Sequence, residues 1–417
     1  MARHTMDTGH ADGALMVAGN QAPVRLGRLR VALAHAGLDA FFIRDLSTIK
    51  WVSAFEGVFD DEAAHALVVT QASAWLHTDG RYVGAAAKAA KGSGIAVDAS
   101  PQAHGDFLAG CLGAEPGAVG IESTLALGEF RKLEAALARP ADATAPAHGT
   151  SAPAHETTAP AHDTSAPAQL VFTLRETEAF VAPLRAVKDA GEIECLKAAQ
   201  AITDAAFAHI VGFIRVGMTE REVQRELEDF MLRRGASALA FPSIVATGKN
   251  AANPHAIPGD DIIQAGQALV LDFGARVRGY CSDMTRTLFL GQPEGRLVRA
   301  YDALRKANEA VEAFLKPGVT GAQAQGLAES LLAQAGFEGL MTHSLGHGVG
   351  IDVHESPVLA TRNTEPLVQG NVVTVEPGIY CPADFGMRLE DFGVITDAGF
   401  EVFTQSSHEM VIIDRFV

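Results

Sequence analysis

The segment ALVLDFGARVRGYCSDMTRTLFL, residues 268–290, contains two apolar runs separated by the turn-like stretch ARVRG. This pattern predicts a β-hairpin with two neighbouring strands. Asp272 and Asp283 are eleven residues apart, with the turn between them. We therefore expect one aspartate on each strand, with their side chains able to converge.

Further β-rich and helical segments lie before and after this hairpin in the sequence. Strands are expected in NVVTVEPGIY (371–380) and MRLEDFGVIT (387–396). Helices are expected in the amphipathic stretches that begin at the capping residues Asp189 and Thr219, and in 296–315 and 320–336. Residues 181–417 are therefore predicted to form an α+β domain, with an antiparallel sheet covered by helices.

A different pattern precedes this domain. The strand-like runs DAFFI, HALVVT, ASAWLHT and AVGIE alternate with helical stretches such as RLGRLRVALAHAG. Residues 20–180 are therefore predicted to form a smaller α/β domain. Within it, residues 144–169 repeat a seven-residue Ala/Pro/His/Thr unit that is unsuited to a core and is expected to be a surface insertion. Its histidines, His148, His155 and His162, are weak metal ligands because such a tract seldom fixes a coordination geometry.

The overall composition narrows the possible partners. A chain of 417 residues with 48% hydrophobic residues is long enough for two cores. A net charge of −17 opposes binding to nucleic acid. The four cysteines show no CxxC pairing, which favours a reducing cytoplasm. No export signal and no membrane-spanning run is apparent, so no membrane partner is expected.

Five side chains that commonly bind metals occur in the β-rich segments, where apolar residues are expected. They are Asp272, Asp283, His347, Glu376 and Glu390. Each acid taken alone can be a solvent-facing strand residue. Together they are harder to explain, since the flanking residues are apolar and a buried carboxylate needs counter-charge.

Two arginines, Arg286 and Arg388, are available as partners, but they cannot satisfy four carboxylates and an imidazole. An oxygen-rich set with one imidazole suits Mn²⁺, Co²⁺, Fe²⁺ or Zn²⁺. Five side chains exceed what one catalytic zinc takes from protein, whereas two ions about 3.5–4 Å apart can share bridging carboxylates. The sequence therefore predicts two divalent ions without distinguishing among these metals, and manganese is our first choice.

The ordered series NPHAIPGD, LVLDFG, GYCSDMTRT, SLGHGVGIDVHESP, VEPGIY and RLED, spread over residues 180–417, resembles the pita-bread metallopeptidase family. This family includes methionine aminopeptidase, aminopeptidase P and prolidase, and creatinase is a relative without metal. In the first domain, DLSTIKWVSAF and WLHTDGRYVGAA are similar to the amino-terminal domain of prolidases. The resemblance thus implies the proline-specific branch and a pita-bread fold for the second domain.

Roles for the five predicted ligands come from this resemblance. Asp272 resembles the bidentate ligand of one ion, and His347 and Glu376 resemble ligands of the other. Asp283 and Glu390 resemble the bridging ligands. Glu376 is also expected to take a proton from the attacking water and pass it to the leaving nitrogen.

Five more residues match family positions that line the substrate site. They are His255, His343, His354, Tyr380 and Arg388. His354 or His255 is expected to donate to the carbonyl oxygen as charge develops on it. Arg388 and Tyr380 are expected to orient the substrate or to support the bridging ligands. His343 can instead be a hydrogen-bonded structural residue.

The expected substrate is a small peptide with proline after its first residue. Two activities share all of these motifs: an Xaa-Pro dipeptidase, which we favour for the overall size and compact first domain, and an aminopeptidase P that acts on longer peptides. A peptide-binding module without catalysis is the alternative from another class, although such modules usually lack ligands that are present here. The resemblance also implies a homodimer, in which the amino-terminal domain closes the partner's site.

Overall fold

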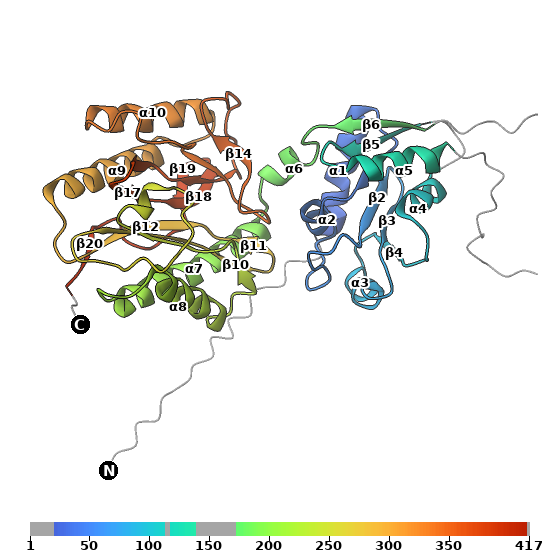
Figure 1. Ribbon diagram of the computed structural model, residues 1–417. Coiled ribbons are helices and arrows are strands. Elements are labelled where there is room, and N and C mark those ends of the chain that lie inside the picture. The colour runs from blue at the N-terminus through green and yellow to red at the C-terminus, as the bar shows by residue number, and fades with distance from the viewer. Residues whose placement is uncertain (1–20, 113–116, 139–171, 415–417) are drawn as a thin grey trace, which may run out of the picture.

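The computed structural model describes residues 21–112, 117–138 and 172–414. The repeat at 144–169 lies outside the described residues. Figure 1 shows two bodies, one of blue to teal elements and one of green to red elements, with the short helix α6 (Ala182–Ala186) between them. The predicted boundary near residue 180 stays a prediction, although α6 lies in this junction.

The first body contains a mixed six-stranded sheet. In order across the sheet its strands are β4 (Ala96–Asp98), β3 (Ala74–His77), β2 (Ala66–Thr70), β1 (Ala40–Ile43), β5 (Ala118–Glu122) and β6 (Thr173–Thr177). Four of these six strands coincide with the apolar runs in the sequence. Its helices are α1 (Ala22–Ala36), α2 (Leu46–Ser53), α3 (Val83–Ala89), α4 (His104–Cys111) and α5 (Leu127–Leu137).

The central strand of this sheet is buried on both faces. Neighbouring side chains of a strand point to opposite faces, so Phe41 packs with Leu29 and Leu33 of α1. Phe42 packs with Phe107 of α4 and Leu133 of α5. Helices therefore cover both faces, as the continuous apolar run DAFFI indicates.

The second body is built on two larger sheets. One has the order β20 (Val411–Ile413), β12 (Met284–Leu290), β9 (Ala268–Phe273), β8 (Ile244–Thr247). The other has the order β14 (Glu355–Leu359), β13 (Gly346–Gly348), β15 (Val372–Val375), β18 (Asp391–Thr396), β19 (Gly399–Val402). The smaller pairings involve β7 (Ala238–Leu239), β10 (Ala275–Val277), β11 (Tyr280–Cys281), β16 (Gly378–Cys381) and β17 (Phe385–Arg388). Within the described part of this body, the pairs of named strands are antiparallel except β12 with β20, in agreement with the predicted α+β class.

Two pairs of helices enclose these sheets (Figure 1). The first pair is α7 (Ala190–Phe213) and α8 (Glu220–Arg233), and the second is α9 (Gly295–Phe314) and α10 (Gly321–Gln334). The first pair packs its apolar faces on β9 and β12. Over the ranges that the structure describes, no helix has the combination of length and apolar character needed to cross a bilayer.

The predicted hairpin is present, with one difference. Strands β9 and β12 pair antiparallel with Asp272 opposite Thr285, and the short strands β10 and β11 form a second hairpin between them. We expected all five predicted ligands inside β segments, but only Asp272 and His347 lie within strands. The other three each lie one residue outside a strand end, where the backbone can leave the strict alternation of side chains.

The predicted caps of α7 and α8 are confirmed, and that of α8 gives a simple stability test. Thr219 Oγ1 accepts the backbone N–H of Glu222 at 3.2 Å, and the Glu222 carboxylate accepts the Thr219 backbone N–H at 2.8 Å. Thr219→Ala is expected to lower the free energy of unfolding by about 1 kcal/mol, because one N–H at the helix start loses its acceptor. Urea unfolding measures this, with Thr219→Ser as the matched control that keeps the hydroxyl. Equal losses in both variants would contradict the capping role.

Candidate metal centre

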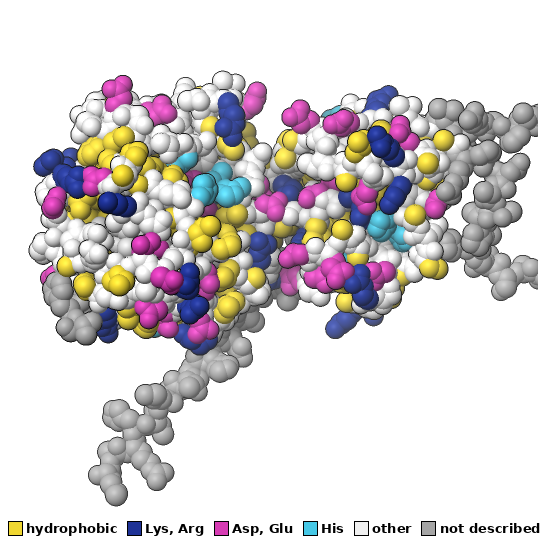
Figure 2. Space-filling view, in the orientation of Figure 1, with side chains coloured by type: hydrophobic (Ala, Val, Ile, Leu, Met, Phe, Trp, Pro, Cys, Tyr) yellow, Lys and Arg dark blue, Asp and Glu magenta, His cyan; other side chains and the backbone are white. Residues whose placement is uncertain are grey.

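The five predicted ligands line one cavity of about 600 Å³ in the second body. They come from segments that are distant in the sequence. Asp272 lies in β9 and His347 in β13, Asp283 precedes β12, Glu376 follows β15, and Glu390 precedes β18. The cavity is therefore formed where the two larger sheets meet. Figure 2 shows histidine side chains gathered on this body, on the side that faces the first body.

The ligand atoms lie close together. Single ligand atoms of Asp283, His347 and Glu390 all lie within 4.8 Å of one another. His347 Nε2 is 3.7 Å from Asp283 Oδ2 and 3.3 Å from Glu376 Oε1. The imidazole nitrogen is thus directed at two of the four carboxylates, and the His347 Nδ1 atom contacts the Gly348 carbonyl at 3.1 Å.

Burial and mutual repulsion change the proton affinities of this cluster. Burial raises the pKa of Asp283 and of Glu390 well above the usual range, and nearby carboxylates raise it further. Burial alone would lower the pKa of His347, but the hydrogen bond to Glu376 and the charges of Glu376 and Asp283 raise it to about 9. Burial opposes ionisation of Glu376, yet His347 lowers its pKa to about 2. The crowding of negative groups therefore favours added positive charge at this site, as a metal cation would supply.

Asp272 provides a direct test of whether the residues fit a cation. Its Oδ2 accepts a hydrogen bond from Arg388 Nη2, while its buried Oδ1 has no hydrogen-bond partner among the described residues. An unpaired carboxylate oxygen in a buried site is costly unless it faces a cation. The donor set of carboxylate oxygens and one imidazole is the kind that divalent ions take.

Three of the other predicted site residues form a hydrogen-bonded chain beside the cluster. Arg388 Nη1 donates to Tyr380 Oη at 2.6 Å, and Tyr380 Oη lies 2.8 Å from His343 Nε2. Burial raises the pKa of Tyr380 to about 12, so its hydroxyl keeps its proton. His343 is thus hydrogen-bonded within the chain and also lines the cavity.

The two remaining histidines lie nearer the opening. The ring of His354 packs edge-on against the ring of His347, with 4.2 Å between centroids. Burial lowers the pKa of His354, and the neighbouring His347 lowers it further. His255 is exposed on the loop that carries NPHAIPGD, and it lines the same cavity. The structure therefore brings together at one site all ten residues singled out in the sequence, Tyr380 among them through its bond to Arg388.

The sequence reasoning missed Thr285 and misplaced Arg286. Thr285 Oγ1 donates to Glu390 Oε2 at 2.7 Å and accepts from Arg388 Nε at 3.0 Å, so it connects two site residues. Its position opposite Asp272 in a hairpin is a signal that could have identified it. Arg286, considered above as a partner for the ligands, instead pairs with Asp391 at 2.7 Å and donates to the Glu390 carbonyl.

The cavity also has an apolar wall and one unexpected cation. The wall is formed by side chains that include Phe241, Ile244, Ile257 and Val353. Arg362 lines the cavity as an exposed residue and has no ion pair within the described part of the chain. The site thus combines a metal-type cluster, an apolar surface and a positive group at its edge.

Two family models match the chain. Residues 194–397 match the model of metallopeptidase family M24, and residues 25–151 match the model of the creatinase/prolidase N-terminal domain. The first match contains all five predicted ligands, and the second covers most of the six-stranded sheet.

Similar proteins and structures agree with these models. An uncharacterized peptidase of Bacillus subtilis is 43% identical over 233 residues, which are 56% of this chain and 66% of that protein. An Xaa-Pro dipeptidase of Lactobacillus delbrueckii is 37% identical over 242 residues, 57% of this chain and 65% of that protein. These alignments span just under two thirds of the two relatives.

The structure of an Xaa-Pro dipeptidase from Bacillus anthracis superposes with a TM-score of 0.80 and 33% identity, covering 94% of this chain and 99% of that one. The structure of an X-Pro aminopeptidase from Thermotoga maritima superposes with a TM-score of 0.74 and 29% identity. It covers 92% of this chain and 100% of that one.

Proposed function

Because the chain belongs to metallopeptidase family M24, we propose that it hydrolyses the peptide bond that precedes proline in short peptides. The observation that carries this proposal is the buried cluster of four carboxylates and one imidazole that line one cavity. The cluster has more carboxylates than arginine side chains neutralise, since Arg388 is the one arginine among the described residues that pairs with a carboxylate of the cluster. It is therefore suited to bind cations rather than to stabilise the fold by itself.

Two divalent ions are the proposed cofactors. Asp272 would hold one ion, and His347 and Glu376 would hold the other. Asp283 and Glu390 would each contribute to holding both ions. Manganese is our first choice, with cobalt, zinc or iron as alternatives that an oxygen-rich site also accepts. When bound, the ions supply a water of lowered pKa and polarise the carbonyl of the scissile bond.

The protein residues have distinct proposed tasks in the reaction. Glu376, a carboxylate in the wall of the cavity, would accept the proton of the attacking water. It would then return this proton to the proline nitrogen as the bond breaks. His354 and His255 line the same cavity and would donate to the carbonyl oxygen, while the Arg388–Tyr380–His343 chain would orient the substrate.

Proline specificity follows from what the substrate lacks. The proline nitrogen carries no hydrogen, so a peptidase that needs to bond that donor fails on it. The apolar wall with Phe241 and Ile244 offers a surface for the pyrrolidine ring. The relatives named as Xaa-Pro dipeptidase and X-Pro aminopeptidase support this specificity.

We favour a dipeptidase over an aminopeptidase P. Arg362 at the edge of the cavity can receive the carboxylate of a dipeptide that ends in proline, and a longer peptide does not present its carboxylate at that position. The same reasoning predicts that the amide Ala-Pro-NH₂ is a poorer substrate than Ala-Pro. A homodimer and a cytoplasmic location stay predictions from the resemblance and from the cysteine usage.

Hydrolysis by chelator-stripped protein tests the proposed function. Ala-Pro, Ala-Pro-NH₂ and Ala-Pro-Ala are offered with and without Mn²⁺, Co²⁺ or Zn²⁺. We expect no cleavage without metal, recovery with metal, and the fastest cleavage for Ala-Pro. Preference for Ala-Pro-Ala would assign the aminopeptidase P activity instead. Failure of every metal to restore cleavage would favour the peptide-binding module.

A further inference from the structure

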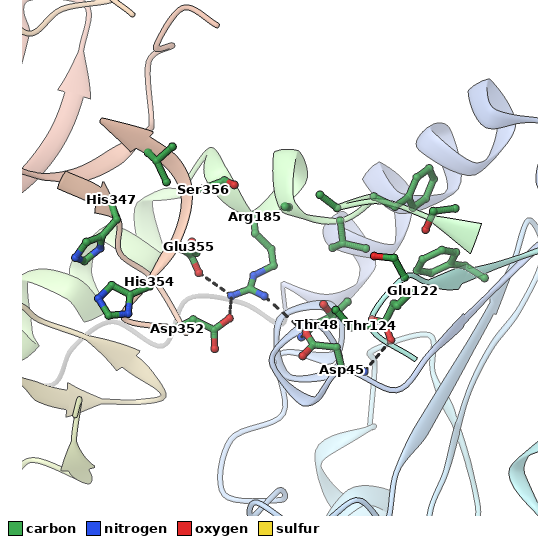
Figure 3. Close-up of a pocket in the computed structure, with 18 residues that line it drawn as sticks. Asp45, Thr48, Glu122, Thr124, Arg185, His347, Asp352, His354, Glu355 and Ser356 are labelled. Atoms are coloured by element: carbon green, nitrogen blue, oxygen red, sulfur yellow. Dashed lines mark hydrogen bonds and ion pairs between the residues drawn. The ribbon is translucent and has the colours of Figure 1, made fainter. Parts of the chain in front are cut away.

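A second cavity of about 420 Å³ lies between the two bodies, beside the candidate metal centre. We call it the interdomain chamber, bounded by Asp45, Glu122, Phe180, Arg185 and His354. His347 and His354 line both cavities, so the chamber adjoins the site where the scissile bond would lie. Figure 3 shows these two histidines on one side of the chamber, Arg185 in the middle, and Asp45 with Glu122 on the opposite side.

The wall contributed by the first body is acidic. Glu122 Oε2 accepts the backbone N–H groups of Arg44 at 2.8 Å and of Asp45 at 2.9 Å. No lysine or arginine of the described residues forms an ion pair with Glu122. Asp45 caps α2 through Thr48 N at 2.7 Å, and its side chain is 43% exposed. Burial raises the pKa of Glu122 to about 7, although the two backbone hydrogen bonds and the charge of Arg44 lower it.

Arg185, the arginine that lines the chamber in the described part of the chain, is already paired with acids of the second body. Arg185 Nη2 lies 2.6 Å from Asp352 and 2.6 Å from Glu355, whereas Arg185 Nη1 is 3.9 Å from Asp45. Lys188 also pairs with Glu355 at 2.6 Å. Arg185 and Lys188 thus pair most closely with Asp352 and Glu355 of the second body. On the side of the first body, Asp45 has no ion pair shorter than 3.9 Å and Glu122 has none among the described residues.

The rest of the chamber suits a long side chain with an apolar stem. Apolar surface is provided by Phe41, Ala179, Phe180, Val181 and Ala182. Hydroxyl groups that can accept hydrogen bonds are provided by Thr48, Ser123, Thr124 and Thr177. Methylene groups can lie along the apolar surface while a charged end reaches the acids and hydroxyls.

We propose that the interdomain chamber binds the side chain of the first substrate residue and that Glu122 and Asp45 select arginine or lysine there. This proposal rests on the peptidase function proposed above and names its preferred substrates as Arg-Pro and Lys-Pro. The guanidinium or ammonium group would supply the ion pair that Glu122 does not form with any described residue, in a partly buried site where such a pair is stronger than at an open surface.

The experiment compares Arg-Pro with citrulline-Pro, whose first side chain has the same shape and no charge, and includes Ala-Pro as the reference. With the metal-loaded wild-type protein, kcat/KM for Arg-Pro is expected to exceed that for citrulline-Pro about tenfold, as one charge-assisted hydrogen bond supplies. In Glu122→Gln, and separately in Asp45→Asn, this ratio is expected to fall several-fold. Both substitutions keep an oxygen for the backbone N–H groups, and Glu134→Gln, on the exposed side of α5, is the matched control that keeps the ratio.

The outcomes separate this proposal from the function on which it rests. Cleavage of Ala-Pro with equal kcat/KM for Arg-Pro and citrulline-Pro would overturn the chamber proposal and leave the peptidase function intact. A ratio that is high but unchanged in both variants would place the selectivity elsewhere and would also overturn it. No cleavage of any of the three peptides would overturn both.

Discussion

Glu376→Gln is expected to lower kcat for Ala-Pro by at least about a hundredfold, because an amide cannot take the proton of the attacking water. Glutamine keeps the size of the side chain and an oxygen that can accept from Thr374 Oγ1, which lies 3.3 Å from Glu376 Oε1. The protein should therefore remain folded. The measurement is kcat at saturating substrate and metal, with circular dichroism to check the fold.

Glu376→Gln can also lose activity by losing bound metal, and this effect must be separated from the loss of the proton acceptor. Glu376 is also a proposed ligand, so bound metal is measured in the same samples. We expect kcat to fall far more than metal content does. Glu365→Gln, an exposed glutamate on a loop of the same body, is the control and should keep full activity. Retention of activity in Glu376→Gln would exclude this residue as the proton carrier.

Glu390→Gln is expected to stabilise the metal-free protein while it removes the stabilisation that metal provides. Burial and the nearby charges of Asp283, Glu376 and Asp272 raise the pKa of Glu390 well above its ordinary value of 4.5. Replacing a repelled buried acid by a neutral side chain of equal size should add about 1–3 kcal/mol to the free energy of unfolding. Added Mn²⁺ at a hundred times its Kd should stabilise the wild type by about 2.7 kcal/mol and the variant by much less.

The pH dependence of the stability gain from Glu390→Gln follows from the raised pKa of Glu390. The folded metal-free protein binds the Glu390 proton more tightly than the unfolded chain does, so its stability falls as the pH rises above 4.5. The advantage of Glu390→Gln should therefore grow as the pH rises above 4.5. Urea unfolding at several pH values, with and without chelator, measures it, and the exposed substitution Glu338→Gln is the control. A variant that is less stable than wild type without metal would show that the cluster is a structural network and not a cation site.

The family was predictable because its motifs are local in the chain. Each motif, such as LVLDFG or SLGHGVGIDVHESP, joins an apolar strand to a polar residue that chemistry requires, and both features can be read from adjacent residues. The matches to the M24 and creatinase/prolidase models confirm this assignment. The caps at Asp189 and Thr219 and the 268–290 hairpin were predictable for the same reason, since each depends on contacts between residues close in sequence.

Contacts between distant segments were not predictable in the same way. The bond of Thr285 to Glu390, the pairing of Arg286 with Asp391 and the Arg388–Asp272 ion pair all join residues more than a hundred positions apart. They depend on how the two larger sheets pack, which periodicity in one segment does not specify. Sequence alone therefore determined the types of ligand and the family. The tertiary structure decided which oxygen of Asp272 has no hydrogen-bond partner among the described residues. It also brought Asp45, Glu122 and Arg185 around one chamber, because packing between sheets and domains sets which distant side chains meet.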